Sequence, residues 1–347
     1  MKVAILAHDR YPIAPPFAGG LESFTWHLVR GLRDRGVEVV LFAGPGSDPA
    51  LEAEELPVMQ FELSDAARAD VAMPPMSQVT TTMAYANALR SIAARSDVDI
   101  VHNNSLHYLP IVLDGTIPQP VVTTLHTPPH PWIEPALRLN PGARTVAVSQ
   151  WVARRWRSIT PSEVIPNGID LSSWPAGPGG DALVWYGRIV PEKAPHRAAL
   201  IARRAGLPLH IAGPLVDTAY FRGTMKPLLG NDIRYEGHLG PDALPELVGR
   251  SAACLVTPEW DEPYGLVAAE AMSCGTPVLS FARGGLTEFV RPPGGECIPP
   301  DASLDEAVVA LQRVTRLDRA AVRRHARDNC ALDAMIGRYI ELYRSLL

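Results

Sequence analysis

The sequence has few cysteines and no long apolar segment. Its four cysteines all lie in the second half of the 347 residues, without a Cys-x-x-Cys pair or a histidine at the spacing of metal ligands. This pattern argues against a zinc site or a disulfide framework, and it favours reduced thiols in a cytoplasmic protein. No segment approaches the roughly 18 apolar residues of a membrane-spanning helix. The opening MKVAILAHDR lacks the features of a signal peptide, so we expect a buried strand there.

An excess of positive charge and two common ligand-binding motifs are also missing. The chain has 32 Lys and Arg against 37 Asp and Glu, a net charge of −5, so nucleic acid is not an expected partner. No Gly-x-Gly-x-x-Gly follows a strand pattern, which argues against an NAD-dependent dehydrogenase. No Asp-x-Asp pair stands at the end of a predicted strand, so we expect neither a metal nor another cofactor.

Strand and helix patterns alternate through both halves of the chain. An apolar strand at 2–7, a glycine-containing loop, a helix expected over 23–36 and a further strand form the repeating unit of a parallel sheet. A passage rich in Pro, Gly and Ser around Pro166 interrupts this alternation, which then resumes. The sequence therefore predicts an α/β protein with two doubly wound, Rossmann-like domains that face each other across a cleft.

We place the first domain at residues 1–166 and the second at residues 167–330. Residues 331–347 predict a final helix that could pack back across the domain boundary. Open parallel sheets bind ligands beyond the carboxyl ends of their strands. The cleft between the two domains is therefore the expected ligand site.

The segment EPYGLVAAEAM sets two glutamates around the start of a predicted helix. Glu262 precedes the turn at Gly265, and Glu270 lies on the helix itself. The free backbone N–H groups at such a helix start attract anions, and each carboxylate can accept hydroxyl groups. Two glutamates in this arrangement are more often simply solvated, so their surroundings decide the interpretation.

Cations and small residues are predicted at the same sheet edges. Arg188 follows a strand and a glycine, and Lys193 lies in the loop that opens the next helix, as a diphosphate site would require. In the first domain, Gly19 and Gly20 close a loop before a helix and would let a backbone approach a phosphate. His126 ends another strand directly before a proline-rich segment and should project into the cleft.

In this order, the elements resemble the family 4 glycosyltransferases, retaining enzymes of the GT-B fold that use nucleotide sugars. The resemblance covers essentially the whole chain. It is carried by GGLESFTWHLVRGLRDRGVEVVLF, VVTTLH, VIPNGID, WYGRIVPEKAP and EPYGLVAAEAMSCGTPV, of which the last, an E-x7-E motif, is the most specific. The resemblance implies an acceptor-side first domain and a second domain that binds the nucleotide sugar.

The same resemblance implies the roles of individual residues. Arg188, Lys193, Glu262 and His126 would be catalytic: the two cations at the diphosphate, Glu262 at the donor-sugar hydroxyls and His126 near the transferred sugar. The other donor-binding residues would be Glu270 at the ribose, backbone groups of His238 and Leu239 at the base, and Gly19, Gly20, Tyr264, Gly265 and Leu266 around the phosphates.

The expected reaction is transfer of a hexose-type sugar to an acceptor, with retention, by attack on the face that the leaving group vacates. A UDP-sugar is the favoured donor, and a small molecule is slightly favoured as acceptor. Two alternatives remain open: an epimerase or hydrolase of nucleotide sugars with the same fold, and a catalytically silent protein that binds them.

The segment SQWVARRWRS has two interpretations. It could make weak peripheral membrane contact through Trp151 and Trp156, or it could be a half-buried surface helix with its tryptophans packed inward, which is the favoured interpretation.

Overall fold

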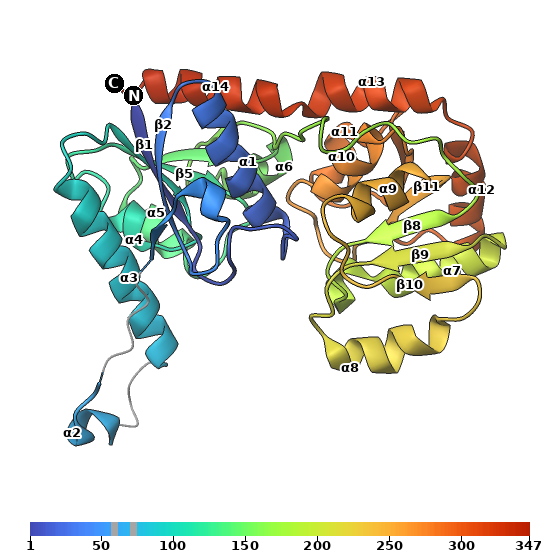
Figure 1. The fold of residues 1–347 in the computed structure, drawn as a ribbon, viewed down its shortest axis with the longest axis horizontal. Helices are drawn as coiled ribbons and strands as arrows, with labels where there is room; N and C mark the ends of the chain where they lie inside the picture. Colours follow the sequence, from blue (N-terminus) through green and yellow to red (C-terminus); the bar gives the residue numbers. More distant parts are fainter. Residues whose placement is uncertain (57–61, 70–74) are drawn as a thin grey trace.

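The computed structural model describes residues 1–56, 62–69 and 75–347. Within these residues the chain forms two parallel sheets, each covered by helices (Figure 1). This confirms the α/β fold of two Rossmann-like domains. In the described ranges no helix is both long and apolar enough to cross a bilayer.

The first sheet has the strand order β3-β2-β1-β4-β5-β6-β7. Its strands are β1 (Lys2–Ala7), β2 (Glu38–Ala43), β3 (Glu54–Glu55), β4 (Ile100–Asn104), β5 (Val121–Leu125), β6 (Arg144–Ala147) and β7 (Glu163–Val164). The accompanying helices are α1 (Gly20–Asp34), the 3-10 turn η1 (Pro49–Leu51), α2 (Asp65–Arg68), α3 (Met76–Ala93), α4 (Leu109–Val112), α5 (Glu134–Leu139) and α6 (Gln150–Trp156). The order reverses between β1 and β4, and ligands of open sheets bind at such a reversal.

The second sheet repeats this topology with the order β10-β9-β8-β11-β12-β13. Its strands are β8 (Leu183–Tyr186), β9 (Leu209–Ala212), β10 (Ile233–Tyr235), β11 (Ala253–Val256), β12 (Val278–Phe281) and β13 (Gly295–Ile298). Its helices and short turns are η2 (Pro191–Lys193), α7 (Pro195–Ala205), α8 (Thr218–Tyr220), η3 (Phe221–Met225), η4 (Lys226–Leu228), α9 (Ala243–Gly249), α10 (Leu266–Ser273), α11 (Leu286–Phe289), α12 (Leu304–Val314) and α13 (Arg319–Cys330). The strand order of this sheet reverses between β8 and β11, which gives the second domain a ligand-binding position of the same kind.

The chain crosses between the domains twice, at neighbouring points. After β7 it passes to β8, and after α13 it returns through Ala331 to α14 (Leu332–Arg344). Ile169 of the first crossing pairs with Ala331 of the second: its N–H donates to Cys330 O, at 2.7 Å, and its O accepts from Leu332 N, at 3.0 Å. Figure 1 shows α13 and α14 running one after the other along the same side of both domains.

Helix α14 packs into the core of the first domain. Its buried face contributes Met335, Ile336, Tyr339, Ile340 and Tyr343 to the cluster that contains α1 and β1. The two tyrosines also make buried hydrogen bonds to the sheet, with Tyr343 Oη 2.6 Å from His102 Nδ1 and Tyr339 Oη 3.1 Å from Thr124 Oγ1. The last helix therefore forms part of the first domain in space, although it follows the second in sequence.

Helix α6 is a half-buried surface helix. Trp156 is fully buried and donates from Nε1 to the Thr127 carbonyl, at 2.8 Å, while Trp151 is partly buried and packs against the core. The membrane contact considered from the sequence would need both indoles at the surface. That interpretation is wrong for Trp156, because apolar packing takes its ring inward.

Helix α1 begins at Gly20, three residues before the sequence pattern indicates. Gly19 is its N-cap, with an extended backbone and no side-chain cap. The first helical residue is a glycine without a side chain, so hydrophobic periodicity could not mark where the helix starts.

Candidate functional site

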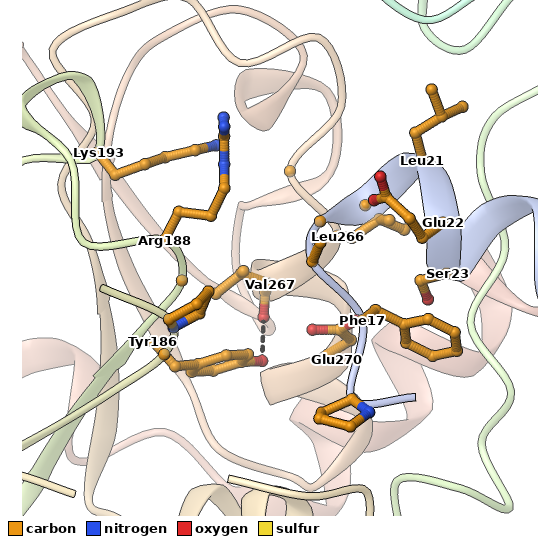
Figure 2. Close-up of a pocket in the computed structure, with 18 of the residues that line it drawn as sticks. Phe17, Leu21, Glu22, Ser23, Tyr186, Arg188, Lys193, Leu266, Val267 and Glu270 are labelled. Carbon is orange, nitrogen blue, oxygen red and sulfur yellow. Dashed lines mark hydrogen bonds between the residues drawn. The ribbon is translucent and has the colours of Figure 1, made fainter. Parts of the chain in front are cut away.

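A cavity of about 510 Å³ lies between the two domains, at the carboxyl ends of both sheets (Figure 2). Its lining includes every site residue expected from the sequence. These are Gly19, Gly20 and His126 from the first domain, and Arg188, Lys193, His238, Leu239, Glu262, Tyr264, Gly265, Leu266 and Glu270 from the second. A volume of this size suits a small organic ligand.

The start of α10 is shaped by Gly265. Its φ is +103°, and a Cβ there would lie 2.3 Å from Leu286 Cδ2, so only glycine fits this turn without strain. The first N–H groups of the helix have no partner within it and lie at the cavity wall, where they favour an anion. The turn thus supplies backbone donors.

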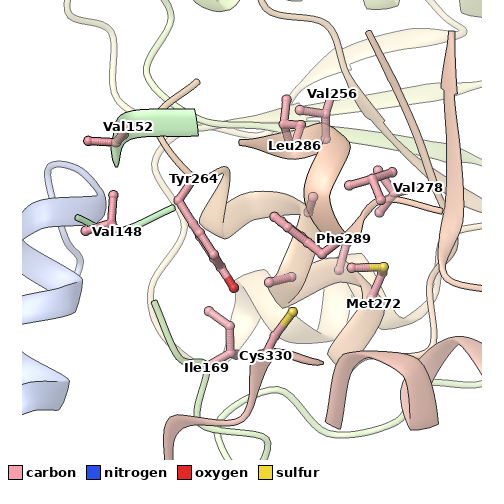
Figure 3. Close-up of a cluster of buried hydrophobic side chains, with 14 of the residues drawn as sticks. Val148, Val152, Ile169, Val256, Tyr264, Met272, Val278, Leu286, Phe289 and Cys330 are labelled. Carbon is pink, nitrogen blue, oxygen red and sulfur yellow. The ribbon is translucent and has the colours of Figure 1, made fainter. Parts of the chain in front are cut away.

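Tyr264 lines the cavity next to this turn, but its ring belongs to the core. The side chain is buried and stacks on Phe289 with ring centroids 4.9 Å apart. Figure 3 shows its hydroxyl pointing toward Ile169 and Cys330. Tyr264 therefore offers a cavity ligand its backbone, and the phenol stays inside the protein.

Glu262 is held by two side-chain donors. Lys193 Nζ forms an ion pair with Glu262 Oε1, and Trp260 Nε1 donates to the same oxygen at 3.0 Å. The Lys193 ammonium also lies 4.9 Å from the centroid of the Trp260 ring, a cation–π distance. Glu262 is 7% exposed. One carboxylate oxygen is thus fixed by the protein, and the other has no side-chain hydrogen bond to the described residues.

Glu270 lies on the second turn of α10 and points into the cavity in Figure 2. Burial raises the pKa of its carboxyl group to about 7, and the nearby Tyr186 hydroxyl opposes that rise only in part. Tyr186 donates its own hydroxyl to the Val267 carbonyl, at 2.8 Å. The carboxyl group therefore changes charge near neutral pH.

Arg188 and Lys193 lie together on one side of the cavity (Figure 2). Arg188 follows β8 directly after Gly187, and its nearest acidic partner is Glu192, with Nη2 3.8 Å from Oε1. This exposed pair is weak, so the guanidinium remains able to bind an anion. His238 and Leu239 follow β10 and line the cavity beside Gly240 and Pro241.

On the first-domain side, His126 is held in one tautomer. Its Nε2 lies 2.8 Å from Asn104 Oδ1, so Nε2 donates its hydrogen and Nδ1 stays unprotonated. Burial lowers the pKa of His126 to about 3, and the Phe24 ring packs edge-on with centroids 4.8 Å apart. His126 is therefore neutral at physiological pH and acts as a hydrogen-bonding group, not as a cation.

Sequence reasoning missed several polar side chains of the cavity wall, among them His8, Glu22 and Trp260. Glu22 stands inside the quoted GGLESF segment, and His8 directly follows the first strand, so position could have marked both. Trp260 carries no such signal, because its contact with Glu262 depends on loop geometry.

In the described ranges no group of three or more His, Cys, Asp or Glu side chains is placed to hold a metal ion.

Comparison with known proteins gives two family matches that meet at residue 173. Residues 18–173 match Glycosyltransferase Family 4, and residues 173–329 match Glycosyl transferases group 1. The chain is 27% identical over 388 residues to glycogen synthase of Mycobacterium tuberculosis (strain H37Rv), which covers 94% of this chain and 89% of that protein. It is 28% identical over 349 residues to D-inositol 3-phosphate glycosyltransferase of Mycobacterium avium (strain 104). That alignment covers 84% of this chain and 80% of that protein.

Solved structures share the whole fold. AviGT4, a glycosyltransferase involved in avilamycin A biosynthesis, superposes with a TM-score of 0.75 at 25% identity, covering 99% of this chain and 97% of that one. The two-domain arrangement around the cavity is therefore that of GT-B glycosyltransferases.

Proposed function

This chain belongs to the family 4 glycosyltransferases, and from that premise we propose that it moves a hexose-type sugar from a nucleotide-sugar donor to a hydroxyl or other nucleophile of an acceptor, with retention and without a metal. The observation that carries the proposal is that Arg188, Lys193, Glu262 and the start of α10 line the cavity from the second domain, while His126 lines it from the first. Two cations, a carboxylate and free backbone donors are the groups that a sugar diphosphate requires.

In this proposal the second domain binds the donor. Arg188 and Lys193 neutralise the diphosphate, the α10 amides contact its oxygens, and Glu270 accepts the ribose hydroxyls. Glu262, whose Oε1 is held by Lys193 and Trp260, accepts sugar hydroxyls through its other oxygen. Backbone groups at His238 and Leu239 contact the base. We favour UDP because UDP-sugars are the commonest donors of the family.

The difficult step is departure of the nucleoside diphosphate. The bond between the anomeric carbon and the phosphate oxygen breaks, its electron pair stays with the diphosphate, and the anomeric carbon gains oxocarbenium character. The acceptor oxygen then bonds to the same face, and its proton passes to the departing phosphate. Each preorganised donor at the diphosphate lowers such a barrier by roughly 3–4 kcal/mol, so two cations and the helix start can act without a metal.

His126 and the Gly19–Gly20 turn complete the site from the first domain. The unprotonated Nδ1 of His126 can accept a hydroxyl of the transferred sugar, since its other nitrogen is committed to Asn104. The glycine turn offers its backbone to the donor. Because these groups come from different domains, we expect the domains to close on the donor about the crossings near Ile169 and Ala331.

Thermal unfolding with UDP, GDP, ADP, TDP and their common sugars tests the donor site. We expect one nucleotide to raise the melting temperature, and we expect Lys193→Ala and Glu270→Ala to reduce that shift. Lys226→Ala is the matched control, because Lys226 is an exposed lysine of the same domain outside the cavity. If no nucleotide shifts the wild type, the donor proposal fails and a scaffold without nucleotide binding is the better account.

Product analysis separates transfer from the two alternatives. Incubation with the preferred donor and no acceptor should release nucleotide slowly and leave the sugar configuration of the remaining donor unchanged. Rapid acceptor-free release would identify a hydrolase, and an epimerised donor would identify an epimerase. The anomeric proton coupling of a glycosylated product reports retention, and an undiminished rate in EDTA supports transfer without a metal.

A further inference from the structure

Two buried titratable side chains of the cavity wall have no part in the donor site. His8 follows β1, Glu22 lies in the first turn of α1, and each is 4% exposed. His8 Nε2 lies 2.7 Å from Glu22 Oε1. Both residues line the cavity. Burying a carboxylate costs free energy, so its placement at the wall of a ligand cavity calls for a function.

The backbone fixes which nitrogen of His8 carries the proton. The Arg10 N–H donates to His8 Nδ1 at 3.1 Å, so Nδ1 is the acceptor nitrogen and the neutral ring carries its hydrogen on Nε2. That hydrogen is on the side of the Glu22 carboxylate. The contact is close but not well aligned: Nε2 has no aligned hydrogen-bond partner among the described residues. The buried N–H of His8 therefore lacks a well-aligned acceptor within the described part of the protein.

Glu22 is on the opposite side of the cavity from the cations. Figure 2 shows its carboxylate at the start of α1, facing away from the α1 axis, with Arg188 and Lys193 across the pocket. A carboxylate in the first turn of a helix is favoured by the helix dipole. It would repel a phosphate, so a diphosphate bound by Arg188 and Lys193 would not be its ligand.

We propose that Glu22, oriented by His8, binds the reacting hydroxyl of the acceptor, which therefore presents a neutral hydroxyl group at this end and not a phosphate or carboxylate. The inference rests on the proposed transferase function and names the acceptor class that it left open. An ionised carboxylate only accepts hydrogen bonds, and a hydroxyl supplies the donor. Glu22 holds the hydroxyl while its oxygen bonds to the anomeric carbon, and the hydroxyl proton still leaves with the departing phosphate. His8 is a positioning residue, because it acts through Glu22.

The first test uses water, the smallest hydroxyl acceptor, so that no other acceptor need be known. UDP release from UDP-glucose is measured for the wild type and Glu22→Gln, together with the thermal shift that UDP produces. Loss of a charge-assisted hydrogen bond should slow release by roughly tenfold to a hundredfold, while the UDP shift stays the same. A Glu22→Gln rate within about threefold of the wild type would overturn the inference. Failure of the wild type to bind UDP would instead count against the UDP donor site.

A second test addresses the class of acceptor and the role of His8. Glycerol, glucose and myo-inositol should accelerate UDP release more than their monophosphates do, and a preference for the monophosphates would contradict the proposal. His8→Gln keeps an N–H near the position of Nε2 and should retain most of the rate, whereas His8→Ala should resemble Glu22→Gln. Equal losses in both His8 variants, with UDP shifts unchanged, would show that His8 does not act through that N–H. Glu38→Gln, an exposed carboxylate of the same domain, serves as the control for charge.

Discussion

Gly20 and Leu266 bring the first turns of α1 and α10 into close contact at the wall of the cavity. A Cβ on Gly20 would lie 2.9 Å from Leu266 Cδ1, so the absence of a side chain at residue 20 sets how closely the two helix starts approach. We expect Gly20→Val to push the two turns apart and to lower kcat/KM for the donor by about tenfold or more, because misplaced groups lose transition-state stabilisation.

A double variant tests this steric explanation. Leu266→Ala removes the atoms that a side chain at position 20 would meet, so Gly20→Val with Leu266→Ala should recover part of the lost kcat/KM. The circular dichroism spectrum and melting temperature show whether each variant is folded. If the double variant is slower than Gly20→Val alone, the contact with Leu266 does not explain the loss.

Lys193 and Glu262 form an ion pair in the free protein, beside the Trp260 ring. Lys193→Met leaves the mostly buried Glu262 carboxylate without its cation, and we expect this to lower the free energy of unfolding by roughly 1–3 kcal/mol. Glu262→Gln in the same chain removes the uncompensated charge and should restore much of that stability, while catalysis stays low. Urea unfolding measures the stability, and UDP release measures catalysis. Additive losses in the double variant would mean that the two side chains are not coupled.

Glu270 gives the free protein a predictable dependence on pH. Its folded-state pKa of about 7 is above the ordinary value of 4.5, so between these values the folded protein keeps a proton that the unfolded chain has lost. Stability should therefore fall as pH rises through this window, by up to about 3 kcal/mol. We expect Glu270→Gln to be more stable than the wild type at pH 8 and similar to it at pH 4.5. Urea unfolding at both pH values checks this, and parallel pH dependences would contradict it.

Much of the fold could be predicted because it follows from the local pattern of apolar, polar and turn residues along the chain. The strands of both domains are short apolar runs between turn residues, and the reversals of a doubly wound sheet follow from their alternation with helices. The cavity-lining residues could be predicted for a related reason: Arg188 and His126 each follow a strand at its carboxyl end, one in each sheet, and both carboxyl edges border the cavity. Position in the chain was sufficient for these residues.

Contacts between distant side chains could not be predicted in this way. The proximity of Glu22 to His8 depends on how α1 lies against β1, and the Trp260 contact with Glu262 depends on the path of one loop. The direction of the Tyr264 ring is a further case, since a motif gives the residue but not which way its side chain turns. Such details are set by packing, which a single sequence does not display.

The tyrosines of α14 give a final prediction, because they connect the chain terminus to the first domain. Tyr343 Oη lies 2.6 Å from Nδ1 of the fully buried His102, whose pKa burial lowers to about 3. Tyr343→Phe leaves that nitrogen without its partner, and we expect a loss of roughly 1–3 kcal/mol in the free energy of unfolding. Tyr108→Phe is the control, because its hydroxyl is only partly buried and its contact with Thr82 is long, at 3.3 Å. The UDP-induced thermal shift should not change in either variant, since neither hydroxyl belongs to the donor side of the cavity.

A chain ending at Ala331 should fail to fold its first domain, because the apolar faces of α1 and the sheet would lose the helix that covers them. Stable folding of that shortened chain would show that α14 is dispensable.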